Sequence, residues 1–165
     1  MYVFQTNLIQ VMNKETKQEE FSALEAELRA LILPQDGLIS NMANFCAALY
    51  SRFDFLWVGF YMIDEDQLRL GPFQGPVACT RIAKGKGVCG SAWSLKETVV
   101  ANDVHKFPGH IACSADSNSE IVLPLLVDNE VKGVLDIDST AFGYFDEIDQ
   151  ECLENIVKWF ASVVY

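Results

Sequence analysis

Apolar residues follow a helical spacing at both ends of the chain. This pattern predicts a first amphipathic helix over residues 17–33 and a closing helix over about 146–163. The segment 34–37 (PQDG) ends the first helix, and Asp36 can cap a second helix that runs to about Phe53. The residues expected on the buried faces are Phe21, Leu24, Leu28, Leu31 and Ile32 in the first helix, Ile39, Met42, Cys46 and Leu49 in the second, and Ile148, Cys152, Ile156, Trp159, Phe160 and Val163 in the closing one.

The middle of the chain instead shows short apolar runs separated by turn residues, which is typical of strands. Two hairpins are expected, one from strands 56–63 and 67–71 and one from strands 121–127 and 131–138; shorter strands at 77–82 and 98–101 enclose a short helix through Trp93. Terminal helices around central hairpins predict an α+β single domain, with the helices on one face of an antiparallel sheet and loops and the short helix on the other. We expect residues 1–16 to form an N-terminal leader and residues 17–165 the domain.

The formal net charge of −11 argues against a nucleic-acid or anionic-membrane partner, because both need basic patches. No apolar run reaches the roughly 20 residues of a membrane span, and the first residues lack the features of a secretory signal. A cytoplasmic protein is therefore expected. Five cysteines are an odd count, which in a reducing compartment favours free or catalytic thiols over structural disulfides.

Cys113 lies in a long connector, residues 102–119, that is rich in small and polar residues. Long irregular connectors are often functional. Cys79 lies in the predicted strand 77–82, and Cys89 begins the short helix, where the helix dipole can lower the pKa of a thiol. The remaining cysteines fall on apolar helix faces and are expected in the core. No Cys-x-x-Cys pair is present, so we expect no metal among the cysteines and histidines.

Two segments place side chains that could form a pocket. Alternation puts Trp57 and Tyr61 on one face of a strand around Gly59, which predicts an aromatic slot, or equally a pair of half-exposed rings covered by a loop. Asp136 and Asp138 likewise share one face of a later strand.

Buried carboxylates need a cation, hydrogen-bond donors or a raised pKa. A substrate ammonium could supply the cation, and a protonated carboxyl could act as a general acid. Glu120, on the adjacent predicted strand, can join this acidic cluster. The alternative for Asp138 is a simple cap of the turn that follows it.

Residues 85–90 (GKGVCG) match the G-x-G-x-x-G pattern of dinucleotide sites, but the strands that follow form a hairpin, so the required βαβ context is missing. The glycines are expected to serve a turn and a close helix approach. His110 could assist Cys113 from the same connector, although structural or solvated histidines are commoner; the same holds for His105.

Taken together, five stretches resemble the free methionine-R-sulfoxide reductases, a family with the GAF fold. They are WVGFY (57–61), LGPFQG (70–75), GKGVCG (85–90), DVHKFPGHIACSADSNSEIVLP (103–124) and GVLDIDS (133–139). The resemblance implies a GAF-like single domain that reduces free methionine-R-sulfoxide, with no bound cofactor and with reducing equivalents from the thioredoxin/NADPH system. A homodimer is left open.

The resemblance also implies roles for single residues. Cys113 matches the nucleophile, Cys79 the resolving thiol that forms the disulfide with it, and Cys89 an auxiliary or alternative resolving thiol. Trp57 and Tyr61 match residues that line the substrate pocket; Glu120, Asp136 and Asp138 match the carboxylates that hold the amino group and assist at the sulfoxide. Ser114 departs from the Asp expected after the nucleophile.

Two other classes compete with this reading. A non-catalytic GAF ligand sensor is the main alternative, because one fold hosts many functions. However, Asp138-Ser139 replaces the Asn-Lys pair typical of the cyclic-nucleotide type, and the acidic residues would repel phosphate. A redox-switch interaction protein would use the same thiols without turnover.

Overall fold

The computed structural model describes residues 14–111 and 113–165. The helices are α1 (Lys14–Leu31), α2 (Leu38–Arg52), α3 (Gly87–Leu95) and α4 (Glu147–Val164), with short 3-10 turns η1 (Pro34–Asp36) and η2 (Val104–Lys106). The strands are β1 (Trp57–Asp64), β2 (Gln67–Gln74), β3 (Arg81–Ala83), β4 (Val99–Ala101), β5 (Ser119–Val127) and β6 (Glu130–Ser139). α1 begins at Lys14, before the expected residue 17, and the rest of the expected leader lies outside the described residues.

The six strands form one antiparallel sheet in the order β3-β2-β1-β6-β5-β4. Both predicted hairpins, β1–β2 and β5–β6, are confirmed. The pairing of β1 with β6 joins them at the centre of the sheet and sets Trp57 opposite Asp138 and Gly59 opposite Asp136. On the other side of β6, Glu120 of β5 lies opposite Asp138. The register therefore gathers the predicted pocket residues on three neighbouring strands.

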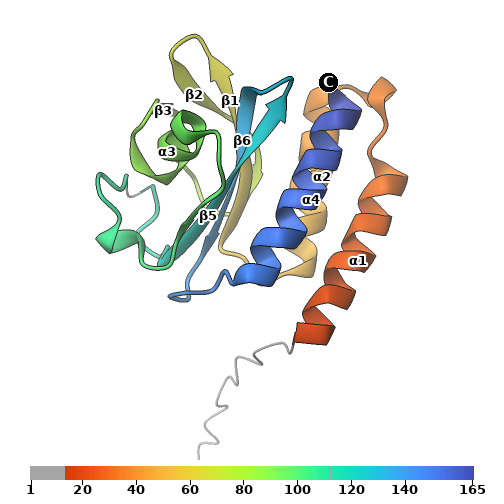
Figure 1. The fold of residues 1–165 in the computed structure, drawn as a ribbon, viewed down its shortest axis with the longest axis horizontal. Coiled ribbons are helices and arrows are strands. Elements are labelled where there is room, and N and C mark those ends of the chain that lie inside the picture. The colour runs from red at the N-terminus through yellow and green to blue at the C-terminus, as the bar shows by residue number, and fades with distance from the viewer. Residues whose placement is uncertain (1–13, 112) are drawn as a thin grey trace, which may run out of the picture.

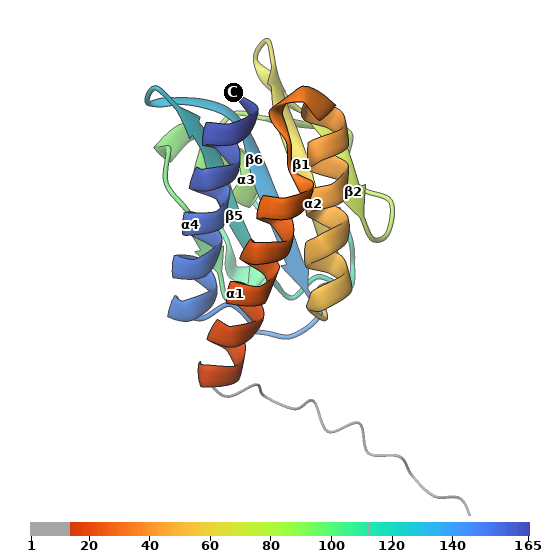
Figure 2. The same cartoon turned by 90° about the vertical axis from the view of Figure 1, so that its right-hand side faces the viewer.

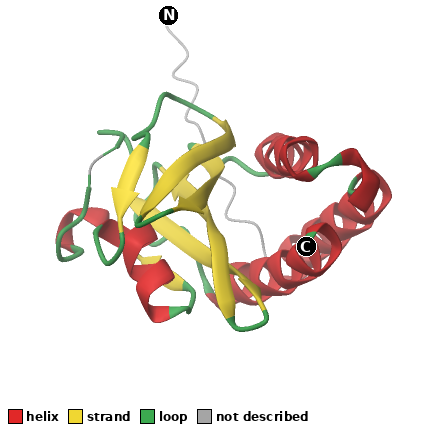
Figure 3. Cartoon of the chain, turned by 90° about the horizontal axis from the view of Figure 1, so that it is seen from above, coloured by secondary structure: helices red, strands yellow, loops and turns green. Residues whose placement is uncertain are grey.

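The helices lie on both faces of the sheet, as predicted from the order of elements. α2 and α4 pack against one face of the sheet, and α1 lies over both of them (Figures 1 and 2). Seen from above, α3 lies on the opposite face of the sheet (Figure 3). None of the described helices is long and apolar enough to span a lipid bilayer.

Strand alternation divides the core into two apolar clusters. Val58, Phe60, Leu135 and Ile137 face the three long helices and belong to the larger cluster. The smaller cluster, on the α3 side, includes Trp57, Tyr61, Val88, Val122 and Val134. The expected assignment of sheet faces is therefore confirmed, and the carboxylates of β6 share the face of the smaller cluster.

Some local predictions were wrong. Asp36 does not cap α2; Gly37 occupies that position and no side chain makes the capping hydrogen bond. Ile39 is 74% exposed because it lies about 120° around α2 from buried Phe45. Leu31 is 42% exposed because it is the last residue of α1.

The buried stripe of α4 also differs from the expected one. It comprises Leu153, Ile156, Val157, Phe160 and Ala161, whereas Cys152 is only half-buried at its margin. The short strand expected over 77–82 begins only at Arg81, so Cys79 lies in a loop.

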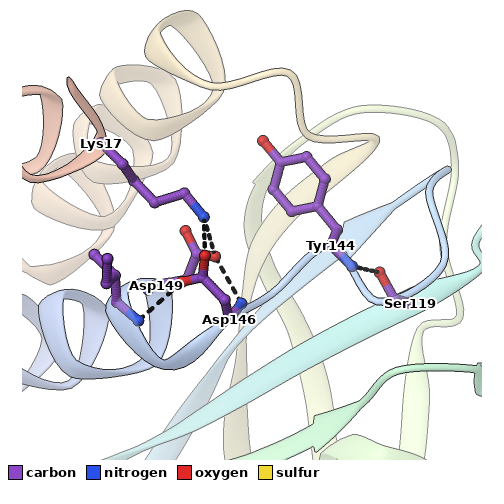
Figure 4. A network of polar contacts seen from close by, with 6 residues as sticks. Lys17, Ser119, Tyr144, Asp146 and Asp149 are labelled. Carbon is purple, nitrogen blue, oxygen red and sulfur yellow. Dashed lines mark hydrogen bonds and ion pairs between the residues drawn. The ribbon is translucent and has the colours of Figure 1, made fainter. Parts of the chain in front are cut away.

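Two ion pairs made by Lys17, one of them partly buried, fasten α1 to the start of α4. Lys17 Nζ lies 2.6 Å from Asp149 and 3.0 Å from Asp146 (Figure 4). Asp146 and Asp149 also cap α4 reciprocally, each side chain accepting from the other's backbone N–H. Just before this cap, the Tyr144 N–H donates to Ser119 Oγ, next to Glu120 in β5 (Figure 4). The helix layer is thereby tied to the strand that carries a pocket carboxylate.

Candidate active site

A pocket opens on the α3 side of the sheet and contains most of the predicted site residues. Its lining includes Trp57, Tyr61, Cys89, Cys113, Glu120, Asp136 and Asp138. The open space in it is about 30 Å³, which is room for one or two water molecules. The structure therefore brings these predicted residues together in one pocket, although they come from α3, three strands and the connector that carries Cys113.

The floor of the pocket is acidic and poorly solvated. Glu120 and Asp136 are each only 6% exposed. Burial, and then the neighbouring carboxylates, raise the pKa of both groups well above the usual range. Burial also raises the pKa of Asp138 to about 6, although a hydrogen bond from Ser117 opposes this. Because three negative charges here are costly, the floor favours bound protons or a cation.

Asp138 is a pocket residue and not the cap of the following turn. Its Oδ1 accepts from Ser117 Oγ at 2.5 Å. The turn is capped by its neighbour, since the Ala141 N–H donates to Ser139 Oγ. Ser117 was not singled out in the sequence; as a small polar residue in an irregular connector it had no periodicity to identify it.

Asp136 has an unsatisfied atom. Its Oδ1 is buried and has no hydrogen-bond partner among the described residues. Buried polar atoms are normally paired, so an orphan of this kind calls for an explanation such as a bound cation or donor. The atom thus supports the expectation that this floor receives a positively charged group.

The wall of the pocket is aromatic. Trp57 stacks on Tyr61 at 5.8 Å and on Phe73 at 5.4 Å between ring centroids. Gly59 permits this arrangement, because a Cβ at that position would overlap the Trp57 ring and the Phe73 side chain. Trp57 and Tyr61 both line the pocket, and their rings are buried instead of half-exposed.

The same two aromatic residues bind the loop that carries Cys79. Trp57 Nε1 donates to the Pro76 carbonyl at 3.1 Å, and Tyr61 Oη donates to the Cys79 carbonyl at 2.9 Å. At Gly75, which has φ of 124°, a Cβ would contact Trp57 and the Leu56 carbonyl. The loop therefore lies directly on the aromatic wall.

Cys79 and Cys113 form a disulfide, with their Cα atoms 5.3 Å apart and a sequence separation of 34. The bond brings the Cys113 connector over the pocket, next to the carboxylates. The thiol pair expected from the family resemblance is thus joined in the structure.

The other cysteines lie in different surroundings. Cys89 is 3% exposed, and its Sγ is 3.8 Å from Glu120 Oε1. Burial, followed by the charges of Asp136 and Glu120, raises the pKa of the Cys89 thiol well above its usual value. The expectation that the helix dipole lowers this pKa was wrong, because desolvation and the carboxylates prevail. Cys46 is buried in the larger cluster, as expected.

The two histidines differ in position. His110 lines the pocket, with Nε2 3.8 Å from Glu120 Oε2, and burial lowers the pKa of its ring, which favours the neutral imidazole. His105 Nε2 instead pairs with Asn118 Oδ1 at 3.0 Å, within the connector. His110 is therefore the histidine placed to affect the chemistry of the pocket.

The antiparallel sheet with long helices on one face and a pocket on the other defines a GAF domain, and the GAF-domain family profile matches residues 37–163. The GAF domain-containing protein A of Dictyostelium discoideum is 51% identical over 89% of this chain and 94% of its own length. The free methionine-R-sulfoxide reductase of Escherichia coli is 47% identical over 90% of each chain.

Solved structures agree. The free methionine-R-sulfoxide reductase of Neisseria meningitidis, in complex with its substrate, superposes with a TM-score of 0.80 at 43% identity, covering 90% of this chain and 87% of the other. The chain belongs to the free methionine-R-sulfoxide reductase family.

Proposed function

We propose that this protein reduces free L-methionine (R)-S-oxide to L-methionine, with Cys113 as the nucleophile. The observation that carries the proposal is the Cys79–Cys113 pair beside a buried acidic pocket. The reductases of E. coli and N. meningitidis described above support the choice of substrate.

The carboxylates and the aromatic wall suit this substrate. Its ammonium group supplies the cation that the orphan Oδ1 of Asp136 lacks. The methyl and methylene groups pack against Trp57 and Tyr61. Glu120 and Asp138, whose pKa values are raised, assist at the sulfoxide by donating a proton to its oxygen. A peptide-bound substrate lacks the free ammonium and is expected to bind poorly.

The reaction balances in two steps before recycling. The Cys113 sulfur attacks the protonated sulfoxide and takes over its oxygen; methionine sulfur gains two electrons, and Cys113 becomes a sulfenic acid. The Cys79 thiol then attacks the sulfenic acid, which forms the disulfide and releases water. Cys89 remains as an auxiliary thiol.

Recycling requires an external dithiol. We assign this to thioredoxin, which reduces the Cys79–Cys113 bond by thiol–disulfide exchange and is itself reduced by NADPH. In the disulfide form the pocket holds one or two waters at most. The Cys113 connector must therefore move outward on reduction before the substrate enters. A cytoplasmic location fits thioredoxin as the electron donor. We also propose a homodimer, which a measurement of the molar mass in solution would test.

The test is a turnover assay on cysteine variants, followed as NADPH consumption with thioredoxin and thioredoxin reductase. Cys113→Ser is expected to be inactive, whereas Cys79→Ser should form one methionine per protein and then stall. Cys152 is a half-buried residue of α4, so Cys152→Ser serves as the control and should keep full activity. Steady-state turnover by Cys113→Ser, or equal rates on the R and S epimers, contradicts the proposal.

The acidic floor is tested by substrate affinity. Asp136→Asn keeps the shape of the side chain and removes its charge, so the apparent affinity for free methionine-R-sulfoxide should fall about tenfold or more. An unchanged affinity would show that Asp136 does not bind the substrate ammonium.

A further inference from the structure

Cys89, Glu120 and Asp136 form a compact donor set at the bottom of the pocket. One ligand atom of each, the thiol sulfur and a carboxylate oxygen from each acid, lies within 4.8 Å of the other two. The three side chains come from α3, β5 and β6, and all are buried. Three elements thus direct one sulfur donor and two oxygen donors to one point.

A second observation also indicates a cation at this point. Asp136 is only 6% exposed, which means that it is 94% buried. Its Oδ1 has no hydrogen-bond partner among the described residues. The Cys89 thiol donates to Glu120 Oε1 at 3.8 Å, which holds its sulfur beside the two carboxylates. The substrate ammonium would use the carboxylates alone, whereas a metal ion would also use the sulfur. A thiolate between two carboxylates is instead a ligand set for a transition-metal ion.

We propose that Cys89, Glu120 and Asp136 bind one Zn²⁺ ion, which inhibits the enzyme by occupying the floor of the substrate pocket. Zinc accepts thiolate and carboxylate ligands at about 2.0–2.3 Å in tetrahedral sites, so donor atoms lie roughly 3.3–3.8 Å apart. The set needs to contract by about 1 Å to reach this geometry. Three protein ligands leave the fourth position to water, as in open zinc sites.

The donor set favours zinc over the commoner divalent ions. Mg²⁺ and Ca²⁺ prefer all-oxygen sites of six or more ligands, whereas a thiolate selects zinc and cobalt. On binding, the Cys89 proton leaves to solvent and the sulfur ligates as thiolate. His110 Nε2, 3.8 Å from Glu120 Oε2, lies beside the site as a neutral nitrogen.

Bound Zn²⁺ would inhibit the enzyme because its site overlaps the acidic floor of the substrate pocket. The inhibition rests on the proposed function. With zinc bound, Asp136 and Glu120 are no longer available to the substrate ammonium or sulfoxide. Zinc and methionine-R-sulfoxide should therefore exclude each other.

The metal site is tested without turnover. In the disulfide form, Cys79 and Cys113 are bonded to each other and cannot ligate. Titration of this form with Co²⁺ alone should give a thiolate-to-cobalt charge-transfer band in the near ultraviolet at one equivalent, and Zn²⁺ should remove it. Mg²⁺ and Ca²⁺ at the same concentrations should leave it unchanged.

Variants decide which residues ligate. The band should disappear in Cys89→Ser and persist in Cys152→Ser, which removes a different free thiol. Asp136→Asn, with Cys89 intact, should weaken Zn²⁺ binding at least tenfold by calorimetry. Circular dichroism confirms the fold of each variant. No band, a band that survives Cys89→Ser, or an unchanged affinity in Asp136→Asn overturns the metal site.

The final arm separates the two proposals. In Cys79→Ser/Cys113→Ser, which has neither the disulfide nor turnover, methionine-R-sulfoxide should raise the apparent Kd of Zn²⁺. In the reduced parent enzyme, Zn²⁺ should inhibit competitively. If Zn²⁺ binds as described but the sulfoxide does not compete, inhibition by overlap is overturned and the placement of the substrate on this floor fails with it. If turnover is normal but Zn²⁺ does not bind, the metal site alone fails.

Discussion

Tyr61 Oη donates a hydrogen bond of 2.9 Å to the backbone carbonyl of Cys79. Tyr61 belongs to β1 at the centre of the sheet, whereas Cys79 lies in the loop before β3. Trp57 Nε1 likewise donates a hydrogen bond to the Pro76 carbonyl of the same loop. The aromatic wall of the pocket therefore also holds the segment that carries the proposed resolving thiol.

We predict that Tyr61→Phe slows disulfide formation more than it slows reduction of the substrate. The variant keeps the ring that stacks on Trp57 and loses only the hydrogen bond to the Cys79 loop. A net contribution of about 1 kcal/mol for this bond corresponds to a roughly fivefold slower closure. Rapid-quench measurement of methionine formed, alongside a sulfenic-acid trapping reagent, separates the two steps.

The matched control is Tyr50→Phe in α2, whose ring is partly exposed and outside the pocket. It should leave both steps unchanged. If Tyr61→Phe slows methionine formation and disulfide closure to the same extent, the hydroxyl acts on the substrate or on the fold and does not position Cys79.

The fold was predictable because each long element repeats one local pattern. The hairpins β1–β2 and β5–β6 follow from alternation and turn residues, and alternation also assigned Asp136 and Asp138 to one face. The errors occur where a tertiary contact prevails over a local pattern. Ile39 is apolar but lies off the buried stripe of α2, and Gly37, not Asp36, is the N-cap of that helix.

The site was predictable only in part. Glu120 could be expected near the aspartates because a hairpin fixes its register. The pairing of Cys79 with Cys113 came from the resemblance alone, since the two cysteines are 34 positions apart in sequence, with β3, α3 and β4 between them. The raised pKa of Cys89 depends first on burial and then on carboxylates from two strands, and both arise only when the sheet and α3 pack together. The position of Cys89 at a helix start suggested the opposite direction.

We predict that Lys17→Met destabilises the fold by roughly 3 kcal/mol, because it leaves the carboxylate of Asp149 buried without its cation. Asp149 is 1% exposed and lies 2.6 Å from Lys17 Nζ (Figure 4). Urea unfolding measures the free energy. The control Lys132→Met removes an exposed pair with Glu130 and should cost less than about 1 kcal/mol.

The double variant Lys17→Met/Asp149→Asn tests the cause. Removing the orphaned charge should recover part of the loss, although the cap of α4 is weakened. A double variant less stable than Lys17→Met alone would assign the effect to packing of the lysine stem.

We predict that Asp138→Asn becomes more stable relative to the parent protein as pH rises from about 4 to about 7. Burial raises the pKa of Asp138 from 3.8 to about 6, so in this window the folded state binds more protons than the unfolded state. The parent's stability from this group is therefore complete below pH 4 and is lost as pH rises through 6. Asparagine does not titrate and can still accept from Ser117. A shift of about two units corresponds to a relative gain on the order of 3 kcal/mol, measured as the difference in unfolding free energy between the two proteins at each pH. A difference that stays constant with pH, or that grows in favour of the parent, would show that Asp138 is ionised at no cost in the folded pocket.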